Sequence, residues 1–288
     1  MSEKTLRVVD LIITASKHLK SKGFENARLE VERMLGSVLG LNRIELYISF
    51  DRPVSETEVG RFRALYRRRL AHEPLQYVTG STEFRELRII TDNRALIPRP
   101  ETEILVSVAI EYLRGYEKPL VADLGTGTGV IALSVAKEIP GAKVVAVELS
   151  DDALQLADEN IQALRLGNSV TLKKGDMLEG VVEFGLFDAI LSNPPYISSG
   201  DIKTLQPEIN VYEPRAALDG GSDGMRYLRT VAENAHRHLK SGGLLLLECG
   251  EEQADIIKKA LEQVCHYRSI EIIKDMTGRE RLVKAIRI

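Results

Sequence analysis

The first quarter of the chain carries apolar residues at three- and four-residue spacing, interrupted by glycine and proline. This spacing is typical of helices that bury one face against each other. Three segments share the pattern, namely residues 6–23, 26–40 and 55–74. Ser55 and Glu58 stand at the start of the third segment with the spacing of a capping box. We therefore predict a small N-terminal helical domain over residues 1–74.

The period then changes, and Thr, Tyr, Val and Ile alternate with turn residues. Short alternating runs between turns are typical of a β-hairpin. We predict that residues 75–91 form a hairpin linker between two domains, with the boundary near Thr91. Residues 101–115 again have a helical pattern, and this helix opens with Glu101 and Glu103, whose charges suit the positive end of a helix dipole.

Further along, short apolar runs alternate with helix-like stretches. The runs are residues 119–125, 143–149, 169–176, 187–193 and 243–250. The alternation is typical of βαβ units, which build a mostly parallel sheet with helices on both faces. Two last runs, residues 268–276 and 279–288, flank the tight turn Thr277-Gly278, so the last strand should run antiparallel. Residues 92–288 are predicted to form this α/β domain with a Rossmann-like sheet.

The composition and the lengths of the apolar runs indicate in which compartment the protein is expected. The 288 residues are 44% hydrophobic and 28% charged, as in ordinary globular proteins. The chain has no apolar run of about 18 residues, and its first ten residues lack the pattern of a signal peptide. We expect a cytoplasmic protein that does not associate with membranes.

Charge and ligand-type residues exclude further classes. The net charge of -3 gives no bulk attraction for nucleic acid. Cys249 and Cys265 have neither metal-type nor redox-type spacing, and the five histidines lack the spacing of metal ligands. We therefore expect free thiols and no metal site.

A glycine-rich segment, DLGTGTG, follows the first strand of the predicted sheet and opens a helix. Glycines there let a ligand approach the backbone at the carboxyl ends of the strands. The candidate cofactor-binding residues are Asp123, Gly125, Thr126, Gly127, Thr128 and Gly129. The spacing is G-x-G-x-G rather than G-x-G-x-x-G, which favours an adenosyl group without pyrophosphate over a dinucleotide. The alternative is an ordinary tight turn.

Acidic residues end the next predicted strand. Glu148, followed by Leu149, comes directly after an apolar run, and its carboxylate can accept both hydroxyls of a ribose. Ser150 is a suitable N-cap for the next helix, with Asp151 and Asp152 in its first turn. We predict that Glu148 and Leu149 bind the cofactor and that the two aspartates are capping charges.

The third strand of the predicted sheet ends at Asp176 and Met177. The Asp176 carboxylate can accept a hydrogen bond from an adenine amino group, and Met177 can pack on the ring face. The alternatives are a solvated turn aspartate and a core methionine.

The segment NPPY follows the fourth strand and therefore lies at the same sheet edge. A planar NH2 group is a poor nucleophile because its lone pair is delocalised. The Asn193 side-chain oxygen and the Pro194 carbonyl can accept its two hydrogens and stabilise positive charge that develops on nitrogen. Pro194 and Pro195 stiffen the backbone without adding an N–H donor, and the Tyr196 ring can lie beside the nitrogen or a sulfonium group.

These properties assign roles within NPPY. We predict Asn193, Pro194 and Tyr196 as catalytic, all four residues of the segment including Pro195 as substrate-binding, and Asn193 as also cofactor-binding. If the sulfonium group donates a methyl group to this nitrogen, no basic side chain is required, because the methylated nitrogen is acidic enough to lose its proton to water. An ordinary strand-ending turn is the alternative, since Asn and Pro commonly form turns.

DLGTGTG, Glu148, Asp176 and NPPY together resemble the class I S-adenosylmethionine-dependent methyltransferases that modify amino nitrogens. Within that class, four segments look like those of the release-factor glutamine methyltransferases, namely IPRPETE (97–103), NPPYI (193–197), YEPRAALDGGSDG (212–224) and MTGRERLV (276–283). The resemblance covers essentially the whole chain. It implies the class I methyltransferase sheet, S-adenosylmethionine as cofactor, S-adenosylhomocysteine as product and no metal. Some relatives carry an aromatic residue at the position of Met177.

The resemblance also implies a protein substrate. This is the glutamine of the Gly-Gly-Gln loop in class 1 peptide chain release factors, methylated on its side-chain nitrogen N5 in support of translation termination. The N-terminal helical domain would dock this partner, direct binding of nucleic acid is not expected, and we expect a monomer. The basic run Arg67, Arg68 and Arg69 either touches the release factor or is a solvated helix face.

Two other segments stay open between a role at the pocket and a structural one. Glu213 and Arg215 either organise a loop beside the substrate or are surface groups. Arg99 and Glu101 either border the cofactor or belong to a rigid linker.

Three rival interpretations fit part of the sequence. A nucleic-acid amino-methyltransferase would also use NPPY, but it has to extract a base and grip phosphates, and no aromatic-interleaved basic tract is present. A nicotinamide-dependent oxidoreductase has only the glycine loop in its favour. A non-catalytic adaptor would keep the fold alone, and an intact NPPY argues against it.

Overall fold

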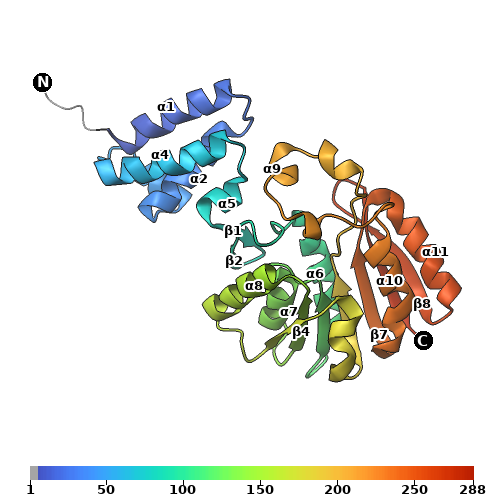
Figure 1. Cartoon of the computed structure of the whole chain (residues 1–288). Helices are drawn as coiled ribbons and strands as arrows, with labels where there is room; N and C mark the ends of the chain where they lie inside the picture. The colour runs from blue at the N-terminus through green and yellow to red at the C-terminus, as the bar shows by residue number, and fades with distance from the viewer. Residues whose placement is uncertain (1–5) are drawn as a thin grey trace, which may run out of the picture. The chain divides into compact units, whose positions relative to one another are not determined.

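The computed structural model describes residues 6–288, and the chain divides into two compact units (Figure 1). One unit comprises Met1–Ser81 together with Pro207–Tyr212, and the other comprises Thr82–Gln206 with Glu213–Ile288. The chain therefore leaves the larger unit for one short segment between NPPY and Glu213.

The described part of the smaller unit is built mainly from helices joined by short loops. Their helices are α1 (Val8–Ser21), α2 (Ala27–Leu39), α3 (Arg43–Ile48), α4 (Glu56–Leu70), α5 (Leu75–Thr79) and α9 (Pro207–Asn210). The three predicted helices are confirmed as α1, α2 and α4. The predicted capping box is confirmed as well, because Ser55 accepts from the Glu58 N–H and the Glu58 carboxylate accepts from the Ser55 N–H.

The two short helices α3 and α5 escaped prediction. Asn42 caps α3 and exchanges two hydrogen bonds with Glu45, so one capping box stabilises the start of a helix of only six residues. Helix α5 follows Pro74 and ends at Gly80, whose φ of 77° suits a helix C-terminus. The first part of the predicted hairpin linker is therefore helical, and only its second part pairs as strands.

Two of the three arginines in the basic run are structural. Arg69 is buried, and its guanidinium contacts carboxylates of Glu30 at 2.6 Å and Glu208 at 3.1 Å. It also lies 4.3 Å from the centroid of the Phe24 ring. Arg68 pairs with Glu73. Of the run, Arg67 alone keeps an exposed side chain without an ion pair among the described residues.

The larger unit contains a hairpin, β1 (Ser81–Phe84) and β2 (Leu87–Ile90), and one seven-stranded sheet. The strands of the sheet are β3 (Leu120–Leu124), β4 (Lys143–Glu148), β5 (Val170–Lys174), β6 (Phe187–Ser192), β7 (Leu239–Glu248), β8 (Tyr267–Lys274) and β9 (Glu280–Arg287). Their order is β5-β4-β3-β6-β7-β9-β8, with β3 to β7 parallel and β9 antiparallel to both of its neighbours. The predicted fold class is confirmed, including the antiparallel last strand.

Helices cover both faces of this sheet (Figure 1). The longer ones are α6 (Pro100–Leu113), α7 (Val130–Glu138), α8 (Asp151–Leu164), α10 (Arg226–Asn234) and α11 (Ala254–Val264). Successive side chains of a strand point to opposite faces, so an all-apolar strand feeds two cores. On β7, Leu244 packs in the core under α6 and α7, whereas Leu245 packs in the core under α10 and α11.

The strand order reverses between β3 and β6. From β3 the chain proceeds outward to β4 and β5, and from β6 it proceeds to β7 on the other side. A crevice opens at such a switch point, outside the carboxyl ends of the strands, and ligands bind there in open α/β sheets.

No helix among residues 6–288 has both the length and the apolar character that a bilayer crossing requires.

Candidate active site

A cavity lies at the carboxyl ends of β3, β4, β5 and β6. It is lined by ten of the predicted residues, namely Gly125, Thr126, Gly127, Thr128, Glu148, Leu149, Asp176, Met177, Asn193 and Pro195. The segment 94–99, Thr102, Pro214, Ala216, Ala217 and Tyr227 are among the other lining residues. The predicted residues outside the lining are Asp123, Gly129, Pro194 and Tyr196.

The glycine loop owes its shape to three left-handed residues. Gly125, Gly127 and Gly129 have φ values of 71°, 56° and 89°, a region that other residue types rarely adopt. The N–H groups of Gly125 and Thr126 both donate to the Val147 carbonyl at 2.9 Å, which ties the loop to the end of β4. The loop thus presents backbone, rather than side chains, to the cavity.

Asp123 lies behind this loop and is fully buried. Its Oδ2 accepts hydrogen bonds from the Thr126 hydroxyl and from the Ala132 N–H, while Oδ1 has no partner among the described residues. Burial raises the pKa of Asp123 to about 7. The structure therefore places this carboxylate where it orders the loop from behind.

Glu148 joins the end of β4 to the glycine loop. Its Oε2 accepts from the Gly127 N–H at 3.0 Å, and its Oε1 accepts from the N–H groups of Leu149 and Ser150 at 2.8 and 3.0 Å. The Ser150 hydroxyl accepts from the Ala153 N–H, so the predicted N-cap of α8 is confirmed. Three backbone donors fix the carboxylate at the cavity wall.

Asp176 and Met177 lie together at the end of β5. The Asp176 carboxylate lines the cavity and makes no hydrogen bond with another residue among 6–288, so its oxygens are available as acceptors. Met177 opens the 3-10 segment η1 (Met177–Phe184) with a φ of 45° and is buried. A Cβ atom added to Gly125 would lie 3.4 Å from the Cε atom of Met177, so the methionine side chain packs against the glycine loop. Met177 is thus a core residue that also forms one wall of the cavity.

Asn193 stands directly after β6 and takes part in a short chain of hydrogen bonds. Its Nδ2 donates to the Thr102 hydroxyl at 3.1 Å, and that hydroxyl donates to Oε2 of Glu248 at 2.8 Å. Thr102 and Glu248 are buried, and burial raises the pKa of Glu248 to about 7. The sequence prediction missed both residues.

The rest of NPPY faces the protein more than the cavity. Pro194 is buried, and Pro195 lines the cavity. The Tyr196 ring packs at the edge of the core under α10 and α11, and burial raises its pKa. Its carbonyl accepts from Gln253 Nε2 at 2.8 Å. The predicted contact between this ring and a substrate nitrogen stays a prediction.

Two glycines of the downstream loop pack directly on the NPPY backbone. A Cβ added to Gly220 would lie 2.8 Å from Tyr196 Cα, and one added to Gly224 would overlap the Tyr196 carbonyl oxygen. Ile197 and the loop also exchange backbone hydrogen bonds, from the Ile197 N–H to Leu218 and from the Gly220 N–H to Ile197. The sequence GGSDG was the signal for this close approach, because only glycine fits so near to a neighbouring backbone.

A partly buried ion pair supports another part of the cavity wall. Arg99 Nη2 donates to both carboxylate oxygens of Glu213, at 2.6 and 2.8 Å. Arg99 lines the cavity, and only 1% of the Glu213 side chain is exposed. Glu213 is therefore an internal organiser of its loop. Arg215 pairs with Asp219 at the surface.

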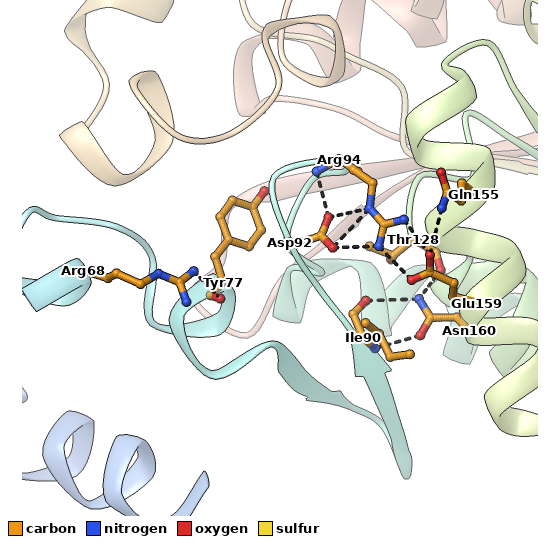
Figure 2. A network of polar contacts seen from close by, with 9 residues as sticks. All are labelled: Arg68, Tyr77, Ile90, Asp92, Arg94, Thr128, Gln155, Glu159 and Asn160. Carbon is orange, nitrogen blue, oxygen red and sulfur yellow. Dashed lines mark hydrogen bonds and ion pairs between the residues drawn. The ribbon is translucent and has the colours of Figure 1, made fainter. Parts of the chain in front are cut away.

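Figure 2 shows a second polar network that supports the glycine loop. The buried Asn160 donates from Nδ2 to the carbonyls of Ile90 and Thr128, and its Oδ1 accepts from the Ile90 N–H. Nearby, Arg94 contacts the carboxylates of Asp92 and Glu159 at 2.7 Å. Asn160 therefore connects β2 with the loop through α8, a role that its sequence position within an amphipathic helix did not reveal.

The switch-point sheet and its cavity define a class I methyltransferase, and comparison with known proteins supports this class. Residues 101–221 match the family model described as the methyltransferase small domain, and residues 10–80 match the one described as the PrmC N-terminal domain. A solved methyltransferase from Pyrococcus furiosus is 26% identical, with a TM-score of 0.50, and the match covers 80% of this chain and 98% of that chain.

Curated relatives narrow the class. A release factor glutamine methyltransferase of Geobacter sulfurreducens is 45% identical over 240 residues, which are 83% of this chain and 83% of that protein. One of Rhodopirellula baltica is 38% identical over 280 residues, covering 96% and 95% of the two chains. The chain therefore belongs to the release factor glutamine methyltransferase family. Its predicted resemblance and enzyme class are confirmed, and the oxidoreductase and adaptor interpretations are set aside.

Proposed function

We propose that this protein transfers a methyl group from S-adenosylmethionine to the side-chain amide nitrogen of a glutamine in the Gly-Gly-Gln loop of class 1 peptide chain release factors. The observation that carries the proposal is the convergence of Glu148, Asp176, the glycine loop and Asn193 on one cavity. The curated relatives are named release factor glutamine methyltransferase, which supports a release factor glutamine as the methylated group.

The residues that line the cavity fit the cofactor. The loop at Gly125–Gly129 exposes backbone, Glu148 offers a fixed carboxylate for ribose hydroxyls, and the Asp176 carboxylate has no partner among residues 6–288. Met177 supplies an apolar wall for the adenine. When bound, the cofactor would supply an electrophilic methyl group on a sulfonium sulfur, whose leaving group is a neutral thioether.

The chain's own groups act on the nucleophile. Asn193 Oδ1 and the Pro194 carbonyl accept the two hydrogens of the glutamine NH2, favour localisation of its lone pair on nitrogen, and stabilise the positive charge that develops as nitrogen bonds to the methyl carbon. Pro194 and Pro195 keep these acceptors rigid. After transfer, the nitrogen loses one proton to water, so no general base is needed from the protein.

A protein substrate accounts for the smaller, helical unit, which contains α1 to α5 and α9. We propose that this unit docks the release factor while the glutamine enters the cavity beside Asn193. Because Arg68 and Arg69 are used inside the unit, docking should rely on other exposed residues. Exposed Ile44 and Ile48 on α3 are candidates.

The test is methylation of a purified class 1 release factor with labelled S-adenosylmethionine, followed by mass spectrometry of its peptides. The expected result is one added methyl group on the glutamine of the Gly-Gly-Gln loop, which is absent when that glutamine is replaced by Ala. A parallel filter-binding assay with DNA and RNA at low salt tests the nucleic-acid rival. Tight, salt-sensitive binding of DNA or RNA together with no label in the release factor would overturn the proposal.

A further inference from the structure

The Asn193 side chain is held by two buried residues from separate elements. Parallel pairing aligns Ser192 at the end of β6 with Leu247 near the end of β7, so Asn193 and Glu248 emerge side by side at the sheet edge. Thr102 comes from the first turn of α6 and stands between them, 3.1 Å from Asn193 Nδ2 and 2.8 Å from Glu248 Oε2.

The hydrogen count fixes the direction of this chain. A threonine hydroxyl has one hydrogen, and an ionised carboxylate can only accept. The Thr102 hydroxyl therefore donates its hydrogen to Glu248, and its oxygen can only accept a hydrogen bond from Asn193. The Asn193 amide must then turn its NH2 towards Thr102, which leaves Oδ1 on the other branch of the amide.

We infer that Thr102 and Glu248 are positioning residues that orient the Asn193 amide so that its oxygen, and not its NH2, meets the substrate nitrogen. The inference rests on the proposed role of Asn193. A flipped amide would set two hydrogen-bond donors against a donor NH2 and would remove the acceptor on which transfer depends.

The orientation should depend on the ionisation of Glu248. A neutral Glu248 can donate to the Thr102 oxygen, which frees the Thr102 hydrogen to point at Asn193 and permits the flipped amide. Several other charged or titratable groups interact electrostatically with Glu248. They are Arg99 and Glu101 before and within α6, Tyr196 of NPPY, Cys249, and Arg281 of β9. Burial, the largest influence, raises the pKa of Glu248 to about 7, so the change falls near neutral pH.

The experiment uses the full-length protein with release factor as substrate and measures kcat, KM and cofactor affinity from pH 6 to 9. Thr102→Val keeps the shape but removes the hydroxyl, and we expect kcat to fall by about 10²-fold, the scale of a misplaced catalytic contact, with cofactor affinity within about threefold. Thr102→Ser should restore most of kcat. Thr230→Val is the matched control on the exposed face of α10 and should leave kcat unchanged.

Replacements of Glu248 separate orientation from packing. Glu248→Gln keeps an acceptor for Thr102 but does not titrate, so the acid limb of the kcat profile near pH 7 should disappear while activity at pH 8 stays well above that of Glu248→Leu. A Thr102→Val enzyme with normal kcat, or a Glu248→Gln enzyme with the same acid limb as the parent, overturns the inference. If Glu248→Leu does not fold, the comparison of Thr102→Val with Thr102→Ser still tests the inference.

The same series separates the positioning role from the proposed function. If Asn193→Ala is slow and Thr102→Val is not, the positioning inference fails and the proposed function stands. If Asn193→Ala retains full activity, the role of Asn193 fails and the positioning inference falls with it.

Discussion

Arg99 and Glu213 form a two-hydrogen-bond ion pair that joins the segment before α6 to the loop following α9. Glu213 is the buried partner, with 1% of its side chain exposed, while 29% of Arg99 is exposed. Burial raises the pKa of Glu213, and Arg99 opposes that rise. The pair thus fixes one wall of the cavity and depends on both members.

Replacing Arg99 by Met should leave the Glu213 carboxylate buried without its cation. We expect the free energy of unfolding to fall by about 2–4 kcal/mol, somewhat less than the about 3–5 kcal/mol for breaking a fully buried pair, because 29% of the Arg99 side chain is exposed. The double variant with Glu213→Gln should recover part of this loss, because a neutral amide is cheaper to bury.

Urea unfolding at pH 8 measures these changes. The surface pair Arg229–Asp223 serves as control, since both side chains are about half exposed and Arg229→Met should change stability by less than about 0.5 kcal/mol. Equal losses for Arg99→Met and Arg229→Met would show that Glu213 does not need its partner.

The sequence could predict the sheet and the ligand edge because both depend on local signals. Continuous apolar runs predict buried strands, and polar residues directly after them, such as Glu148, Asp176 and Asn193, must fall at the carboxyl edge. The glycine loop is equally local, because its positive φ values require glycine. These positions follow from the chain alone once the strands are parallel.

The roles of the residues that escaped prediction depend on which distant segments pack against each other in the fold. Glu248 ends the apolar run GLLLLECG, and nothing in that run shows that β7 pairs with β6. Thr102 is one polar residue in a helix start, and Asn160 is one of many in an amphipathic helix. Asp123 was predicted at the ligand but is not a lining residue of the cavity. Its carboxylate instead accepts a hydrogen bond from the hydroxyl of Thr126, three residues further along the chain.

Asn193→Ala should lower turnover by about 10²–10³-fold, because it removes one preorganised acceptor from the charge that develops on nitrogen. Cofactor affinity should change much less. Single-turnover methylation of a release factor measures the first and calorimetry the second. Asn234→Ala on α10 is the control for an asparagine replacement remote from the cavity, and an unchanged rate for Asn193→Ala would contradict a catalytic role for this side chain.

Glu148→Ala should weaken cofactor binding by about 10–10³-fold, because a ribose would lose hydrogen bonds to a charged acceptor that three backbone N–H groups hold in place. The fold should persist, since the carboxylate lies at the cavity wall. Calorimetric titration with S-adenosylmethionine measures the change, and Asp152→Ala, an exposed acid in the first turn of α8, is the charge-matched control. Equal affinities for the parent and Glu148→Ala would remove Glu148 from the site.

The pKa of Glu248 also predicts how stability changes with pH. Burial raises this pKa from 4.5 to about 7, so between these values the folded state binds a proton that the unfolded chain has released. That contribution is fully present below pH 4.5 and is lost as pH rises through about 7. Relative to Glu248→Gln, the parent protein should therefore lose on the order of 3 kcal/mol of unfolding free energy between pH 5 and pH 8. Urea unfolding of both proteins at the two pH values measures the difference, and parallel changes would mean that Glu248 titrates normally in the folded protein.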